Sequence, residues 1–241
     1  MFSPILILRK RNINEAKLCF IMSKVFKDVY HVGDSGCSVF LVDTQSDDGL
    51  VLIDAGMSIQ MIQKVSKFGL NVRDIKHCIL THFHIDHIAA CFDLKELNKH
   101  IKFYAHDLDA DAIEERGHGT KTAASWYGVD YKPVNLEMRF KEEIVSLRFG
   151  DLEFQCIHTP GHTPGSISVL VVVDGMKILF GQDIHGPFMK SFGSDLNAYQ
   201  DSMKRLLDLN ADILCEGHFG VFQPAEAVHR YIKDYMERNK T

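Results

Sequence analysis

The sequence predicts a single α/β domain in which short buried strands alternate with helices. Apolar runs such as residues 50–53 and 167–173 are bounded by turn-forming Gly and Asp, which is typical of strands. Residues 195–209 instead place their apolar side chains at helical spacing. The 241 residues are 46% hydrophobic and 24% charged, enough to bury one sizeable core. We expect residues 23–241 to form this domain, after an N-terminal extension over residues 1–22.

The first part of the domain is predicted to open with three strands and a helix. The strands cover residues 25–32, 37–42 and 50–53, and turns rich in Gly, Asp and Ser separate them. Apolar residues at helical spacing cover residues 58–68, and Gly69 ends that helix. Residues 74–76 then lead into the apolar run of residues 78–80, which is typical of the end of a buried strand.

The remaining elements follow the same alternation. Residues 89–92 begin a helix, residues 101–105 form a strand, and Asp107 is expected to cap a helix over residues 108–115. Two hairpins pair residues 143–148 with 151–158 and residues 167–173 with 177–180. A helix over residues 195–209, a strand over residues 212–215 and a closing helix that begins at Pro224 complete the domain.

Residues 117–133 break this periodicity and contain the only tryptophan, Trp126. Long irregular segments in compact domains are commonly functional. Two interpretations fit the segment: a lid that lines a substrate pocket, or a surface connection with Trp126 packed inward.

A cluster of metal-binding residue types directly follows the apolar run of residues 78–80. His82 and His84 alternate, so an extended segment points both side chains the same way. Asp86 and His87 follow as the chain turns toward a helix. Apolar neighbours on both sides indicate burial, where imidazoles and a carboxylate need a partner. The spacing predicts a metal site that suits zinc, with iron or manganese as alternatives.

Further polar residues stand at other predicted strand ends. Asp54 ends the strand over residues 50–53, His162 sits in the Pro- and Gly-rich loop 159–166, and Asp183 and His218 each follow a strand. Taken alone, Asp54 is equally typical of a turn or a helix cap.

The pattern His82-X-His84-X-Asp86-His87 resembles the signature of the metallo-β-lactamase superfamily. The other strand-end residues match that family's remaining motifs in the same order, from about residue 25 to the C-terminus. The resemblance implies a four-layer αβ/βα sandwich, with two mixed β-sheets face to face and helices on the outer faces. It also implies that Asp54 holds the metal loop and that His158 is structural.

Carried over to this sequence, the family pattern implies two metal ions, most simply two Zn²⁺. The first takes His82, His84 and His162; the second takes Asp86, His87 and His218; Asp183 bridges them. Each metal keeps open positions, as catalytic sites do. The implied reaction is hydrolysis by a metal-bridging hydroxide. The candidate catalytic residues are Asp86, Asp183 and His185, the last for orienting substrate or donating a proton unless it only forms the pocket rim.

Departures from relatives narrow the substrate to a small ester, thioester or lactone. Authentic β-lactamases of the superfamily lack the bridging carboxylate that Asp183 supplies, and lactonases often carry Tyr where this chain has Gly186. Extra domains of glyoxalase II and of nucleic-acid-processing members have no counterpart in the sequence. Alternatives are β-lactam hydrolysis and an iron-dependent redox enzyme of the persulfide dioxygenase kind, which metal identity would distinguish. A non-catalytic binding module is a third alternative, although such members usually lose ligands.

Net charge and cysteine spacing limit the kinds of partner and the cellular compartment that we expect. The formal net charge of −5 argues against a nucleic-acid substrate, so we expect a small-molecule substrate. No segment has transmembrane length, and residues 2–8 lack the preceding positive charges of a signal peptide. None of the six cysteines has CxxC spacing, which predicts buried free thiols, a reducing compartment and a cytoplasmic protein. The sequence does not indicate an oligomeric state.

Overall fold

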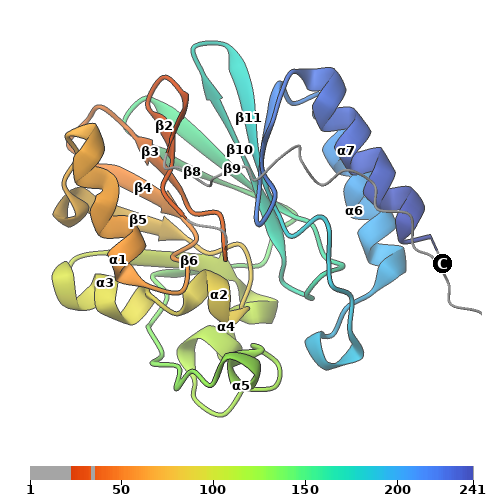
Figure 1. The fold of residues 1–241 in the computed structure, drawn as a ribbon, viewed down its shortest axis with the longest axis horizontal. Helices are drawn as coiled ribbons and strands as arrows, with labels where there is room; N and C mark the ends of the chain where they lie inside the picture. Colours follow the sequence, from red (N-terminus) through yellow and green to blue (C-terminus); the bar gives the residue numbers. More distant parts are fainter. Residues whose placement is uncertain (1–22, 34–35, 241) are drawn as a thin grey trace, which may run out of the picture.

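The computed structural model describes residues 23–33 and 36–240, which form two facing β-sheets covered on both outer sides by helices (Figure 1). The predicted four-layer sandwich with two mixed sheets is therefore confirmed. The predicted extension over residues 1–22 lies outside the described residues. Among the residues described, no helix has the length and apolarity that crossing a membrane requires.

The first sheet has seven strands in sequential order, antiparallel from β1 to β4 and parallel from β4 to β7. Its strands are β1 (Ser23–Phe26), β2 (Val29–His31), β3 (Phe40–Asp43), β4 (Leu50–Ile53), β5 (Ile75–Ile79), β6 (Lys102–His106) and β7 (Met138–Phe140). The single strand predicted over residues 25–32 is instead the β1–β2 hairpin. Lys27 turns the chain there with a positive φ of 44°, a conformation that apolar alternation does not reveal.

The second sheet has six strands in the order β13-β12-β11-β10-β9-β8, and only the β11–β12 pair is parallel. They are β8 (Ile144–Phe149), β9 (Leu152–His158), β10 (Ile167–Val173), β11 (Met176–Gln182), β12 (Ile213–Glu216) and β13 (Gly220–Phe222). Both predicted hairpins are present. The short edge strands β7 and β13 were not predicted, because three residues are too few to show a period.

The two sheets share one apolar core. On β4, Val51 and Ile53 face the second sheet, while Leu50 and Leu52 pack on the helix side. The rings of Phe40 and Phe180, from opposite sheets, lie 5.5 Å apart. Burial on both faces explains why the strands read as continuous apolar runs rather than alternating ones.

Helices of the N-terminal half cover the first sheet, and two C-terminal helices cover the second (Figure 1). The first set is α1 (Ile59–Ile62), α2 (Ile85–Ile88), α3 (Cys91–Leu97), α4 (Asp107–Glu114) and α5 (Ala124–Tyr127); the second is α6 (Leu196–Asp208) and α7 (Ala225–Arg238). The helix predicted over residues 58–68 begins as α1 and continues as the 3₁₀ helix Gln63–Phe68. Short 3₁₀ turns at Val72–Asp74 and Lys190–Phe192 complete the elements.

The cap of α4 differs from the prediction. The residue before the helix is His106, whose Nδ1 accepts from Leu108 N–H at 3.2 Å, while Asp107 is the first helical residue. The His106 ring also stacks on His158 with the ring centroids 3.9 Å apart. Nε2 of His158 donates to the Pro164 carbonyl at 2.9 Å, so this structural histidine supports the loop that carries His162.

The His106 cap is expected to make stability fall in weak acid. Burial, with a smaller contribution from His158, lowers the pKa of His106 from 6.5 to about 4. Above pH 6.5 the His106 imidazole is neutral in both the folded and the unfolded chain. Between pH 6.5 and about 4 it is protonated in the unfolded chain but still neutral in the folded chain. Stability is therefore lost across this window as the pH falls. We expect a loss on the order of 1 kcal/mol after solvent screening.

His106→Asn isolates this effect, because asparagine caps helices well and does not titrate. Urea unfolding with a chelator present, at about pH 7.5 and about pH 4.5, should show a smaller acid-induced loss in the variant than in the wild type. Equal losses in the two proteins would exclude His106 as the cause.

Candidate metal centre

The seven predicted ligands lie together at one end of the sandwich, where loops leave both sheets. The loops follow β5, β9, β11 and β12, and they carry, in that order, His82, His84, Asp86 and His87; His162; Asp183; and His218. Backbone hydrogen bonds join these loops to other segments: Ile167 N–H donates to the Thr81 carbonyl at 2.9 Å, and Ser38 N–H donates to the Gly217 carbonyl at 2.6 Å. Hydrogen bonds to the rest of the chain thus hold in place the loops that carry the predicted ligands.

The first group of ligands contains three histidines and Asp183, with all ligand atoms within 4.8 Å of one another. Nε2 of His162 lies 2.8 Å from Nδ1 of His84 and 3.5 Å from Oδ2 of Asp183. Nε2 of His82 lies 3.8 Å from the same carboxylate oxygen. All four side chains are buried.

The second group contains Asp86, His87 and His218. Nε2 of His218 lies 3.3 Å from Oδ2 of Asp86 and 3.3 Å from Oδ2 of Asp183. Nε2 of His87 lies 3.3 Å from Oδ1 of Asp183. The Asp183 carboxylate therefore stands between the two groups and contacts both.

Hydrogen bonds behind the cluster decide which imidazole edge faces inward. The single hydroxyl proton of Thr81 goes to Oδ2 of Asp54 at 2.8 Å, so Thr81 Oγ1 accepts from Nδ1 of His82 at 3.0 Å. Asp54 Oδ2 also accepts from Nδ1 of His87 at 2.8 Å. Asp54 thus anchors two of the inward-facing rings, the place that the resemblance implied for it.

The first group is electrostatically suited to bind a cation. Burial lowers the pKa of His162 to about 4 and those of His82 and His84 well below the usual range, so these imidazoles are neutral. His162 donates its Nδ1 proton to the Pro187 carbonyl at 3.0 Å, which leaves a lone pair on Nε2. Among the described residues, the buried Nε2 of His82 has no hydrogen-bond partner. Buried polar atoms are normally paired, so a metal ion fits this position.

The second group calls for positive charge. Burial would raise the pKa of Asp183, but His87 and His218 hold it well below its usual range. Asp86 is likewise held below its usual pKa by the same histidines, against the effect of burial. Burial would lower the pKa of His218, but Asp183 and Asp86 raise it to about 10. A divalent cation satisfies the same demand, and its binding would release protons.

A cavity of about 210 Å³ opens onto this cluster. Its lining combines cluster ligands with residues of the irregular segment and of the loop after β11, namely His84, Asp86, Ala123, Trp126, Tyr127, Asp183, His185, Pro187, Phe192 and His218. The Trp126 side chain is not packed into the core; it is 56% exposed and its ring lies 5.2 Å from that of Phe192. Ala123, Trp126 and Tyr127 of the segment 117–133 therefore form one wall of the cavity, in line with the lid interpretation.

His185 faces the cavity and is held from behind by Glu216. Its Nδ1 donates to Oε1 of Glu216 at 2.8 Å, while Oε2 of the same carboxylate accepts the backbone N–H groups of His218 and Phe219, each at 2.8 Å. Glu216 is fully buried. Its role was not predicted from the sequence, although a carboxylate that ends the apolar strand β12 is a signal that could have indicated it.

Asp109 is a second residue whose role the sequence analysis missed. It is fully buried on α4 and accepts three hydrogen bonds: from Phe83 N–H at 3.2 Å, from Thr163 Oγ1 at 2.7 Å and from Gly165 N–H at 2.7 Å. Phe83 stands between two ligands, and Thr163 follows His162 directly. One carboxylate thus joins the two loops that supply the first group of ligands. An acidic residue beside buried alanines on one helix face was the available signal.

Comparison with protein families identifies the chain at the level of sequence. The sequence model of the metallo-β-lactamase superfamily matches residues 32–218. Relatives include an uncharacterized protein of Aquifex aeolicus, 36% identical over 54% of this chain and 56% of the relative, and the hydroxyacylglutathione hydrolase GloC of Haemophilus influenzae, 26% identical over 74% of this chain and 82% of the relative. The match spans about half the length of several of these curated relatives, including the Aquifex aeolicus protein.

Solved structures agree with this assignment. A subclass B3 metallo-β-lactamase with an active-site glutamic acid superposes with a TM-score of 0.76 at 25% identity, covering 90% of this chain and 88% of that one. A subclass B3 enzyme of Bradyrhizobium japonicum, at 22% identity, has the same fold with a TM-score of 0.76, covering 90% of this chain and 91% of that one. Because the family model matches most of the domain, the chain belongs to the metallo-β-lactamase superfamily.

Proposed function

We propose that this protein is a dinuclear, zinc-dependent hydrolase of a small ester, thioester or lactone. The position of Asp183 carries the proposal, because its carboxylate contacts both ligand groups and would help to hold a cation at each of them. The donor set of imidazoles and carboxylates suits zinc. The relative named hydroxyacylglutathione hydrolase GloC supports the choice of substrate class, because an acylglutathione is a thioester. Free buried thiols at five of the six cysteines favour a reducing, cytoplasmic setting.

The residues around the cavity would have different roles in such a reaction. When bound, divalent cations acidify a water molecule and polarise the substrate carbonyl. Asp86 and Asp183 would hold these cations together with the histidines. Because Glu216 occupies Nδ1 of His185, Nε2 is the ring nitrogen that His185 can offer to a substrate. Tyr127 lines the same cavity, so a bound substrate would lie among these groups.

Metal content tests the proposal first. Protein purified without added metal or chelator should contain two zinc ions per chain by plasma mass spectrometry. It should hydrolyse members of a panel of aryl esters, acyl thioesters and simple lactones, lose this activity to a chelator, and regain it with zinc. Iron at one or two ions per chain would contradict the proposal and favour oxygen or sulfur redox chemistry. Zinc-loaded protein that hydrolyses nothing in the panel would contradict the substrate class.

A further inference from the structure

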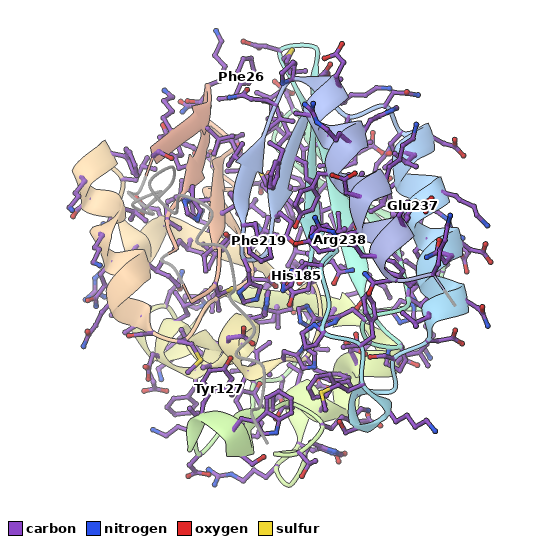
Figure 2. The ribbon with its side chains drawn as sticks, turned by 45° about the vertical axis from the view of Figure 1, so that its right-hand side comes forward. Phe26, Tyr127, His185, Phe219, Glu237 and Arg238 are labelled. Atoms are coloured by element: carbon purple, nitrogen blue, oxygen red, sulfur yellow. The ribbon has the colours of Figure 1, made fainter. Side chains whose placement is uncertain are left out.

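An aromatic surface continues from the cavity onto α7. Phe219, Tyr235 and Arg238 form what we call the aromatic shelf. The Phe219 ring lies 4.8 Å from His185, the Phe219 and Tyr235 rings are 6.4 Å apart and inclined by only 26°, and the Arg238 guanidinium sits 4.8 Å from the Tyr235 ring centre. Figure 2 shows Phe219 beside His185, with Tyr127 below both. The shelf thus begins where the cavity wall ends.

The two ends of the site differ in chemistry. Beside the first ligand group, the wall is apolar: Phe192 packs 4.2 Å from His84 by ring centroids and Trp126 packs on Phe192. Beside the second group, His185 lies 5.0 Å from His218 and leads onto the aromatic shelf. An acyl group therefore fits the apolar end, and the rest of the substrate fits the shelf.

Arg238 gives the far end of the shelf a positive charge. Within the described residues, no carboxylate lies within ion-pair distance of its guanidinium, whereas the neighbouring Glu237 is paired with Lys240. The Phe219 side chain is 48% exposed, so a flat group can reach its ring. Two nearly parallel rings that end at a guanidinium without a carboxylate partner among the described residues match an aromatic ring that carries a carboxylate.

We propose that the substrate is an acyl ester or thioester whose leaving group is the phenol or thiol of an aromatic ring that also carries a carboxylate, with this ring on the aromatic shelf and its carboxylate at Arg238. This inference rests on the proposed function. Hydrolysis breaks the acyl C–O or C–S bond, adds the hydroxyl of water to the acyl carbon and transfers the other water proton to the leaving group. The shelf then holds the departing aromatic acid, and the apolar end holds the acyl product.

Binding tests the shelf without any turnover. The butanamides of 3-aminobenzoic acid and of aniline differ only in the carboxylate and resist hydrolysis. Trp126, the only tryptophan, lines the cavity, so its fluorescence reports binding of either amide. The wild type should bind the carboxylated amide about fivefold more tightly, as for a partly screened ion pair. Arg238→Gln should abolish this preference. Arg230→Gln, which removes the same charge two turns earlier on α7, should keep it.

Turnover separates this inference from the proposed function. The butyrate esters of 3-hydroxybenzoic acid and of phenol share an acyl group, and the wild type should show about fivefold lower KM for the carboxylated ester. Hydrolysis of both esters with no preference, together with equal binding of the two amides, would overturn the shelf but leave the hydrolase standing. If the amides show an Arg238-dependent binding preference but neither ester is hydrolysed, the proposed hydrolase would be overturned and the shelf would stand as a binding site. An equal loss of preference in Arg230→Gln would also overturn the inference, because it would trace the effect to net charge.

Discussion

Asp183→Ala is expected to bind at most one metal ion per chain and to lower kcat/KM at least about 10³-fold for any ester or thioester that the wild type hydrolyses. The side chain contacts both ligand clusters, so its loss removes a predicted ligand from each position at once. It also removes one of the carboxylates that face His87 and His218. Plasma mass spectrometry and steady-state kinetics measure the two effects on the same preparation.

Asp174→Ala is the matched control for this experiment. Asp174 lies in the exposed turn of the β10–β11 hairpin, the same hairpin whose second strand delivers Asp183. This control should keep both metal ions and full activity. Circular dichroism should show that Asp183→Ala remains folded, since the removed atoms lie at the end of a strand and not in the inter-sheet core. A folded Asp183→Ala protein with unchanged turnover would refute the role of this carboxylate.

The parts of the molecule that could be predicted from sequence are those encoded by neighbouring residues. Central strands such as β4, β10 and β12 are buried on both faces and therefore read as apolar runs, and the predicted ligands follow strand ends, so each loop indicates its own chemistry. The family resemblance then supplied what spacing alone does not, namely that four separate loops meet at one place. The hairpin at Lys27 was missed because the residue with positive φ is a lysine, which is not one of the residue types that mark turns.

What could not be predicted depends on partners distant in the chain. In the sequence, Glu216 is only an acidic residue at a strand end, and its role follows from a hydrogen bond to His185, 31 residues away. Asp109 is only an acidic residue on a helix, and its role follows from a hydrogen bond to Thr163, 54 residues away. The same holds for the cavity wall, since only the folded chain brings Trp126 against Phe192. These residues set the position of the ligands and the shape of the cavity, which the ligand motif does not specify.

Asp109→Asn is expected to weaken metal binding by the first ligand group about 10- to 100-fold, the range typical of residues that orient metal ligands. Both carboxylate oxygens accept hydrogen bonds, Oδ1 from Gly165 and Oδ2 from Phe83 and Thr163. An amide in either orientation places an NH₂ group against an N–H or O–H donor, so at least one of the two loops loses its anchor. Zinc competition titration against a chromogenic chelator measures the affinity directly and requires no substrate.

Two further variants distinguish loop positioning from a general loss of stability. Asp111→Asn changes an exposed acid of the same helix and should keep wild-type zinc affinity. Gly165→Ala disturbs the hydrogen bond between Gly165 and Asp109 from the loop side, because a Cβ at Gly165 would lie 2.6 Å from the Asp109 carboxyl carbon. It should weaken zinc binding in the same direction as Asp109→Asn. If both variants lower the chelator-treated Tm but bind zinc as tightly as the wild type, Asp109 supports the fold alone. If zinc affinity falls in both, the distance between His84 and His162 is set by a carboxylate that touches neither.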